Sequence, residues 1–186
     1  MTPLASLWLP IVVSSVFVFI LSSVIHMAPL WHRTDFPRMP NEDGVRDALR
    51  PLAIPPGEYM VPRPSSAAEM RSPEFLEKME KGPVAMMTVF PNGRMGMGRS
   101  LGLWFLYLLA VGLFAAFVAG RALPPGAPYR PVFKFVGVTA FLAYTAAIWQ
   151  LWIWYRRSMS ITMKATLDGL IYAAVTAGTF GWLWPR

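Results

Sequence analysis

The feature that most constrains this chain is an apolar run at positions 4–28 that contains no Asp, Glu, Lys or Arg. A helix rises ~1.5 Å per residue, so about 20 such residues cross the ~30 Å hydrocarbon core of a bilayer. No Lys or Arg precedes Trp8, and no good small-residue cleavage site follows the run. We therefore interpret the run as a retained membrane anchor and not as a cleaved signal peptide.

Three later stretches repeat this character, at about 101–123, 133–155 and 167–184. Charged residues make up only 15% of the chain, well below the quarter that is usual in a soluble domain. The sequence thus predicts a mainly α fold, a four-helix transmembrane bundle in a multi-pass protein of the cell (inner) membrane. Its expected divisions are 1–28 for the first transmembrane helix, 29–100 for an extramembrane segment and 101–186 for the other three helices.

The segment 29–100 differs from the rest because it holds nine of the ten acidic residues, the tenth being Asp168. Asn41 is a good N-cap for a helix over 42–50, and Ser72 followed by Pro73 starts a second helix that runs to about 81. Short apolar runs at 59–61 and 84–90 read as strands beside Pro-Gly and Asn-Gly turns. We expect these elements to form a small α+β cap. It has few apolar residues, so we expect it to pack against the membrane helices or against a partner.

The net charge of +7 raises the possibility of a nucleic-acid partner. The cations bracket the apolar spans instead of lining one face, as Arg130, Lys134, Arg156, Arg157 and Lys164 show. Cations in such positions meet lipid headgroups, so we expect the lipid bilayer as partner and no nucleic acid. The positive-inside rule then favours a cytoplasmic location for 29–100, with both termini outside.

Small residues recur at four-residue spacing in the last three spans, which lets helix backbones approach closely. The expected helix-packing residues are Gly112, Ala116, Gly120, Ala143, Ala147, Ala173, Ala177 and Gly181. Asp168 is expected to be a helix-capping residue within the first turns of the last span, where free backbone N–H groups stabilise a carboxylate and where Lys164 can pair with it.

Candidate ligands are few. His26 and His32 are the two histidines, and six residues apart on a continuous helix they point to different faces. Methionine sulfur is a soft ligand that suits Cu(I), and four methionines lie close together in sequence: Met86, Met87, Met95 and Met97. The alternative is that they are flexible apolar side chains that pack near a membrane surface. No cysteine and no convergent acid, base or nucleophile set is present. We therefore expect no catalytic residue, no cofactor and no metal site.

Several stretches carry a resemblance to known proteins. They are Pro40-Asn41-Glu42-Asp43, Pro56-Gly57-Glu58-Tyr59-Met60, Asp168-Gly169-Leu170-Ile171-Tyr172 and the tail 176–185. Together they resemble a family of small bacterial integral membrane proteins. The resemblance implies a bacterial membrane location, and it transfers no activity, ligand or site.

Two functional classes remain. The first is a non-catalytic accessory or scaffold subunit that packs against other membrane protein subunits. The alternative is a small transporter or channel component, which needs a polar path with ionisable groups near mid-depth. The continuous spans and packing ridges favour the first class.

Overall fold

The computed structural model describes residues 1–27 and 31–186 and divides the chain into two compact units. We call Met1–Pro37 with Gly96–Arg186 the helical unit, and Arg38–Met95 the inserted unit. The predicted boundary between the first span and the following segment, at residues 28 and 29, lies outside the described residues. Each unit is described by itself.

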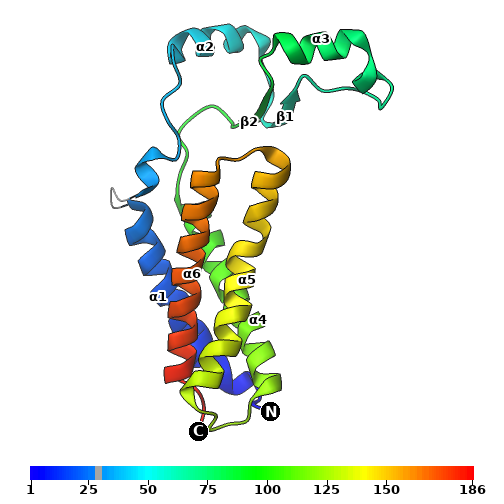
Figure 1. Cartoon of the computed structure of the whole chain (residues 1–186). Helices are drawn as coiled ribbons and strands as arrows, with labels where there is room; N and C mark the ends of the chain where they lie inside the picture. The colour runs from blue at the N-terminus through cyan, green and yellow to red at the C-terminus, as the bar shows by residue number, and fades with distance from the viewer. Residues whose placement is uncertain (28–30) are drawn as a thin grey trace. The chain divides into compact units, whose positions relative to one another are not determined.

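Four long helices build the helical unit (Figure 1). They are α1 (Trp8–Met27, after the short 3₁₀ turn η1, Leu4–Leu7), α4 (Gly98–Ala122), α5 (Tyr129–Tyr155) and α6 (Met159–Trp182). Within the described residues, three helical stretches are long and apolar enough to cross a membrane: Leu4–Met27, Gly98–Ala122 and Tyr129–Tyr155. The fourth helix, α6, has 24 residues but also carries Lys164 and Asp168.

The last three helices begin earlier than the apolar runs predict. The expected starts were 101, 133 and 167, whereas the helices start at Gly98, Tyr129 and Met159. Hydropathy marks only the apolar part of a helix, and polar first turns add residues that it does not detect. The difference is largest in α6, whose first two turns contain Ser, Thr and Lys side chains.

Each long helix packs against two others, α1 against α4 and α6, and α5 against α4 and α6. The short connection through Pro124 and Pro125 makes α4 and α5 neighbours, and Gly126 supplies the left-handed residue (φ +72°) that this turn requires. Thr2 N donates a backbone hydrogen bond to Gly120 O near the end of α4 (2.8 Å), and Gly126 N of the connection donates one to Pro185 O (2.8 Å).

Small residues set how closely these helices approach. A Cβ on Gly120 would lie 2.8 Å from the carbonyl oxygen of Thr2, and one on Gly112 would lie 3.3 Å from Ile11 Cγ2. A Cβ on Gly169 of α6 would overlap Thr145 of α5. Side chains at these positions would push the helices apart, so the bundle depends on their absence.

The inserted unit contains α2 (Glu42–Leu49), β1 (Gly57–Val61), α3 (Pro73–Lys81) and β2 (Ala85–Val89). The two strands pair antiparallel, with Gly57 opposite Val89 and Tyr59 opposite Met87. Both helix starts follow the predicted caps: the Asn41 side chain accepts a hydrogen bond from Gly44 N (3.3 Å) and Ser72 Oγ accepts one from Phe75 N (3.2 Å). The predicted two helices and two strands are therefore confirmed.

Candidate functional site

The two histidines come together because α1 ends between them. The helix stops at Met27, and His32 belongs to a separate 3₁₀ turn, η2 (Trp31–Thr34). The two imidazole rings stack with centroids 4.5 Å apart and planes 9° from parallel. The expectation that they point to different faces assumed one continuous helix and is wrong.

Asp168 joins the histidines from α6. Ser158 is the N-cap of this helix, and Asp168 stands ten residues later, beyond the first turn where backbone N–H groups are free. The helix-capping role does not fit this position, because the helix begins well before the apolar run. Instead the carboxylate is buried (4% exposed), and its Oδ2 lies 2.9 Å from His32 Nε2.

Asp35 and Lys164 hold His32 from the other side. Asp35 Oδ2 lies 2.8 Å from His32 Nδ1, and Lys164 Nζ donates to Asp35 Oδ1 (2.7 Å) and to Thr34 Oγ1 (2.9 Å). Lys164 thus pairs with Asp35, not with Asp168 as expected. Burial favours the neutral carboxyl group, but the hydrogen bonds from Lys164 and His32 outweigh it and hold the pKa of Asp35 below its ordinary value.

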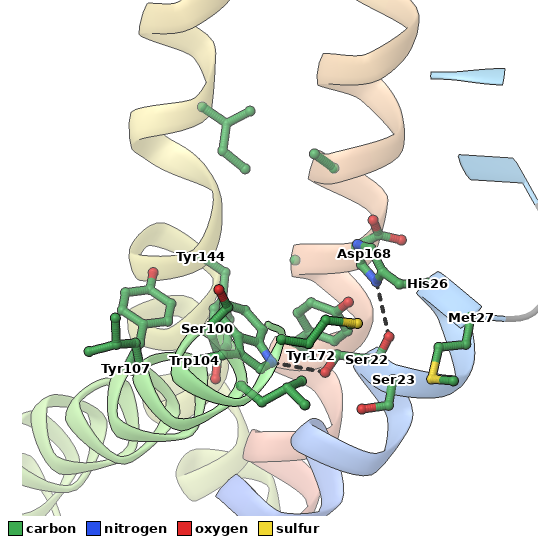
Figure 2. Close-up of a pocket in the computed structure, with 16 residues that line it drawn as sticks. Ser22, Ser23, His26, Met27, Ser100, Trp104, Tyr107, Tyr144, Asp168 and Tyr172 are labelled. Atoms are coloured by element: carbon green, nitrogen blue, oxygen red, sulfur yellow. Dashed lines mark hydrogen bonds between the residues drawn. The ribbon is translucent and has the colours of Figure 1, made fainter. Parts of the chain in front are cut away.

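His26 is oriented by its own helix. Its Nδ1 lies 3.0 Å from the carbonyl oxygen of Ser22, and the Ser22 hydroxyl in turn accepts a hydrogen bond from Trp104 Nε1 of α4 (2.9 Å). Figure 2 shows both bonds and places the His26 ring beside the Asp168 carboxylate. The cluster therefore draws on α1, η2 and α6, with α4 supporting it.

These bonds decide which ring nitrogens carry lone pairs. The Ser22 carbonyl oxygen can only accept, so Nδ1 of His26 bears a hydrogen and the neutral ring carries its lone pair on Nε2. Both nitrogens of His32 face carboxyl oxygens, Nδ1 that of Asp35 at 2.8 Å and Nε2 that of Asp168 at 2.9 Å. A neutral His32 has one hydrogen for these two contacts, so the second contact needs a further proton, on His32 or on the carboxyl group, or a metal cation.

Beside the cluster lies a pocket of about 790 Å³. Its lining is mainly apolar and aromatic, and it includes His26, Asp168, Trp104, Tyr144 and Tyr172 (Figure 2). Within the described part of the chain, two buried polar atoms of this region have no hydrogen-bond partner: Asp168 Oδ1 and the Tyr172 hydroxyl. Polar atoms of this kind are costly to bury, and they are available to a ligand.

Three of these side chains form a set that can hold a metal ion. His26, His32 and Asp168 each offer one ligand atom, and the three atoms all lie within 4.8 Å of one another. Sequence reasoning missed this set because its members are up to 142 positions apart (168 − 26) and meet only through tertiary packing. The usable signal was the pair of histidines near the end of the first apolar run, together with a single acid in the last predicted helix.

The methionine group is not brought into a comparable set. Met86 and Met87 are consecutive in β2, so their side chains point to opposite faces of the strand. Met95 and Met97 are both well exposed.

The small residues expected to pack helices occupy two environments. Six contact or lie inside the bundle: Gly112, Ala116, Gly120, Ala173 and Ala177 are buried, and a Cβ on Gly181 would lie 2.5 Å from Tyr129 Cδ2. Ala143 and Ala147 of α5 are exposed on the outside of the bundle.

No protein-family model, curated protein or solved structure matches the chain. What can be said about its function comes from its own residues and contacts.

Proposed function

We propose that this chain is a multi-pass protein of the bacterial inner membrane and a non-catalytic accessory or scaffold subunit of a larger membrane complex. The observation behind this proposal is that the inserted unit buries few of its apolar side chains. Among its residues Phe75 is the one fully buried apolar side chain. Its large apolar side chains are otherwise mostly exposed: Met39, Leu49, Leu52, Met60, Val61, Met70, Leu76, Met79, Val84, Met86, Phe90 and Met95.

Such a unit is poorly suited to stand alone in water. A two-stranded sheet is marginal without a further apolar face to pack on, and monomeric proteins rarely expose large contiguous apolar patches. On α3, Leu76 (50% exposed) and Met79 (39% exposed) are three residues apart and share one face of the helix. A protein surface that covers this face supplies the apolar contacts that the unit lacks, and we assign that role to another subunit.

The proposal includes four membrane crossings. The fourth helix, α6, is long enough at ~1.5 Å per residue to cross the hydrocarbon core. Its two charges are compatible with a crossing because each meets an opposite or polar partner inside the helical unit, Lys164 at Asp35 and Asp168 at His32. Four crossings put both termini on one side, opposite to residues 29–100, which the positive-inside rule assigns to the cytoplasm.

Reporter fusions at Ser66 and at the C-terminus test the number of crossings. Opposite sidedness of the two reporters supports this topology, and same-sided signals overturn it.

The accessory role is tested by mild detergent extraction from native membranes, followed by mass spectrometry of whatever migrates with the chain. Stoichiometric co-migration with a larger assembly is expected for the wild type. The double variant Leu76→Ser/Met79→Ser removes the apolar face of α3 and should release the chain from the assembly. The matched control Glu80→Ser changes an exposed residue of the same helix and should leave the assembly intact. A wild-type chain that always migrates alone contradicts the proposal.

A transporter or channel component is the second candidate, favoured by the buried ionisable cluster beside the pocket. Ionisable groups inside a membrane bundle commonly mark a substrate or ion path. Reconstitution of the chain alone in liposomes separates the two functions, because solute movement by the lone chain favours transport.

A further inference from the structure

We propose that His26, His32 and Asp168 bind one divalent transition-metal ion of the zinc class. This inference concerns the helical unit and does not depend on the accessory role, which rests on the inserted unit.

The donor atoms fit this class of ion. Two imidazole nitrogens and one carboxylate oxygen suit Zn²⁺ and its neighbours, whereas Mg²⁺ and Ca²⁺ prefer oxygen alone and Cu(I) prefers sulfur. The three atoms lie within 4.8 Å of one another. Tetrahedral bonds of about 2.0–2.1 Å place ligand atoms about 3.3 Å apart, so small side-chain rotations close the site. The pair His32 Nε2 and Asp168 Oδ2, at 2.9 Å, is already close enough.

The hydrogen bonds made by the other ring nitrogen of each histidine are those found in metal sites. Metal-binding histidines usually donate their other ring N–H to a carbonyl or carboxylate oxygen, which fixes the tautomer and makes the free nitrogen more basic. His26 does so to the Ser22 carbonyl, and His32 does so to Asp35, which Lys164 holds in turn. When each Nδ1 donates in this way, Nε2 is the nitrogen that can bind an ion, and His32 Nε2 already lies 2.9 Å from Asp168 Oδ2.

The charged groups of the cluster and its access from the pocket also favour a bound cation. The cluster contains two carboxyl groups, Asp35 and Asp168, and one ammonium group, that of Lys164, which pairs with Asp35. A cation compensates the charge of an ionised Asp168 in a region where burial makes uncompensated charge expensive. His26 is exposed and also lines the pocket, which gives the ion an entry path and leaves room for a fourth ligand.

A proton between His32 and Asp168, on either the ring or the carboxyl group, is the competing explanation, because it also accounts for the 2.9 Å contact between these two residues. The two explanations require different residues. A proton at this contact does not need His26, whereas a metal site uses both histidines together with Asp168.

The test is a titration of the purified full-length chain in lipid nanodiscs, freed of metal with a chelator and carrying no polyhistidine tag. With Zn²⁺ as the probe, calorimetry and elemental analysis are expected to give one ion per chain. His26→Ala and Asp168→Asn each remove a ligand and should weaken binding by about 100-fold or more, because losing even a partner behind a ligand costs about 10–100-fold. The control Asp43→Asn removes an exposed carboxylate of the inserted unit and should leave the affinity unchanged.

A measurement on the wild type guards against variants that fail to fold. X-ray absorption of the Zn²⁺-loaded chain should show two imidazoles and oxygen ligands at about 2.0–2.1 Å, with no sulfur. Absence of stoichiometric binding, equal affinity in wild type and His26→Ala, or sulfur ligation each overturns the proposal.

Discussion

The two units of this chain bury their apolar side chains in opposite ways. The helical unit has two buried clusters, one around Leu7, Ala116 and Phe180 and one around Val18 and Tyr172. The inserted unit buries only Phe75 fully and leaves most of its large apolar side chains exposed. The helical unit is therefore organised by its own packing, whereas the inserted unit has its local structure but little core.

Exposed apolar side chains have a different meaning in the two units. On the helical unit, exposed residues such as Phe114 and Val138 are what a lipid-facing surface requires and need no further explanation. The inserted unit belongs to a segment rich in charge, Pro and Gly that cannot span a bilayer, and the proposed function assigns the same kind of exposure there to a partner surface.

The largest predicted effect is a difference in stability between matched Phe→Ala variants of the two units. Phe180 is fully buried, and Phe90 is 60% exposed. Phe180→Ala should lower the free energy of unfolding by about 2–3 kcal/mol, mainly through the cavity left behind, because the unfolded reference in detergent is also apolar. Phe90→Ala should change it by less than about 0.5 kcal/mol. Unfolding in detergent followed by circular dichroism checks both, and equal effects would break the comparison.

A smaller effect probes how tightly the helical unit is packed. A Cβ on Gly169 would overlap Thr145 and lie 3.2 Å from Tyr144 Cβ, so Gly169→Ala should destabilise the α5–α6 contact by about 1–2 kcal/mol. The matched control is Gly102→Ala in α4, where a Cβ meets nothing within 4 Å. It should be neutral or slightly stabilising, because alanine favours a helix more than glycine does. The same unfolding assay compares the two, and a neutral Gly169→Ala would show that the helices are not in close contact there.

Local signals in the sequence predict much of this architecture. Charge-free runs mark the apolar helices, and Asn41 and Ser72 mark the helix starts of the inserted unit because capping acts within three residues. Helix starts at Gly98, Tyr129 and Met159 were missed, since polar first turns carry no hydropathy signal.

The candidate site was out of reach of the same reasoning. His26 belongs to α1 and His32 to the separate turn η2, and no periodicity in the sequence predicts that their rings stack. Asp168 was assigned to a helix start because α6 was expected to begin eight residues later than it does, at 167 instead of 159. Contacts between side chains so far apart in sequence depend on how four helices pack, and no local pattern encodes them.

Hydrogen exchange on the purified full chain in nanodiscs, with and without its co-migrating assembly, tests most directly whether the inserted unit depends on a partner. In the lone chain, the β2 amides of Ala85–Val89 should exchange within about minutes, while those at the centre of α4 persist for hours. In the assembly, exchange of the β2 amides should slow by about tenfold or more, with α4 unchanged. β2 amides as slow as those of α4 in the lone chain would contradict this account, because the inserted unit would then be stable without a partner.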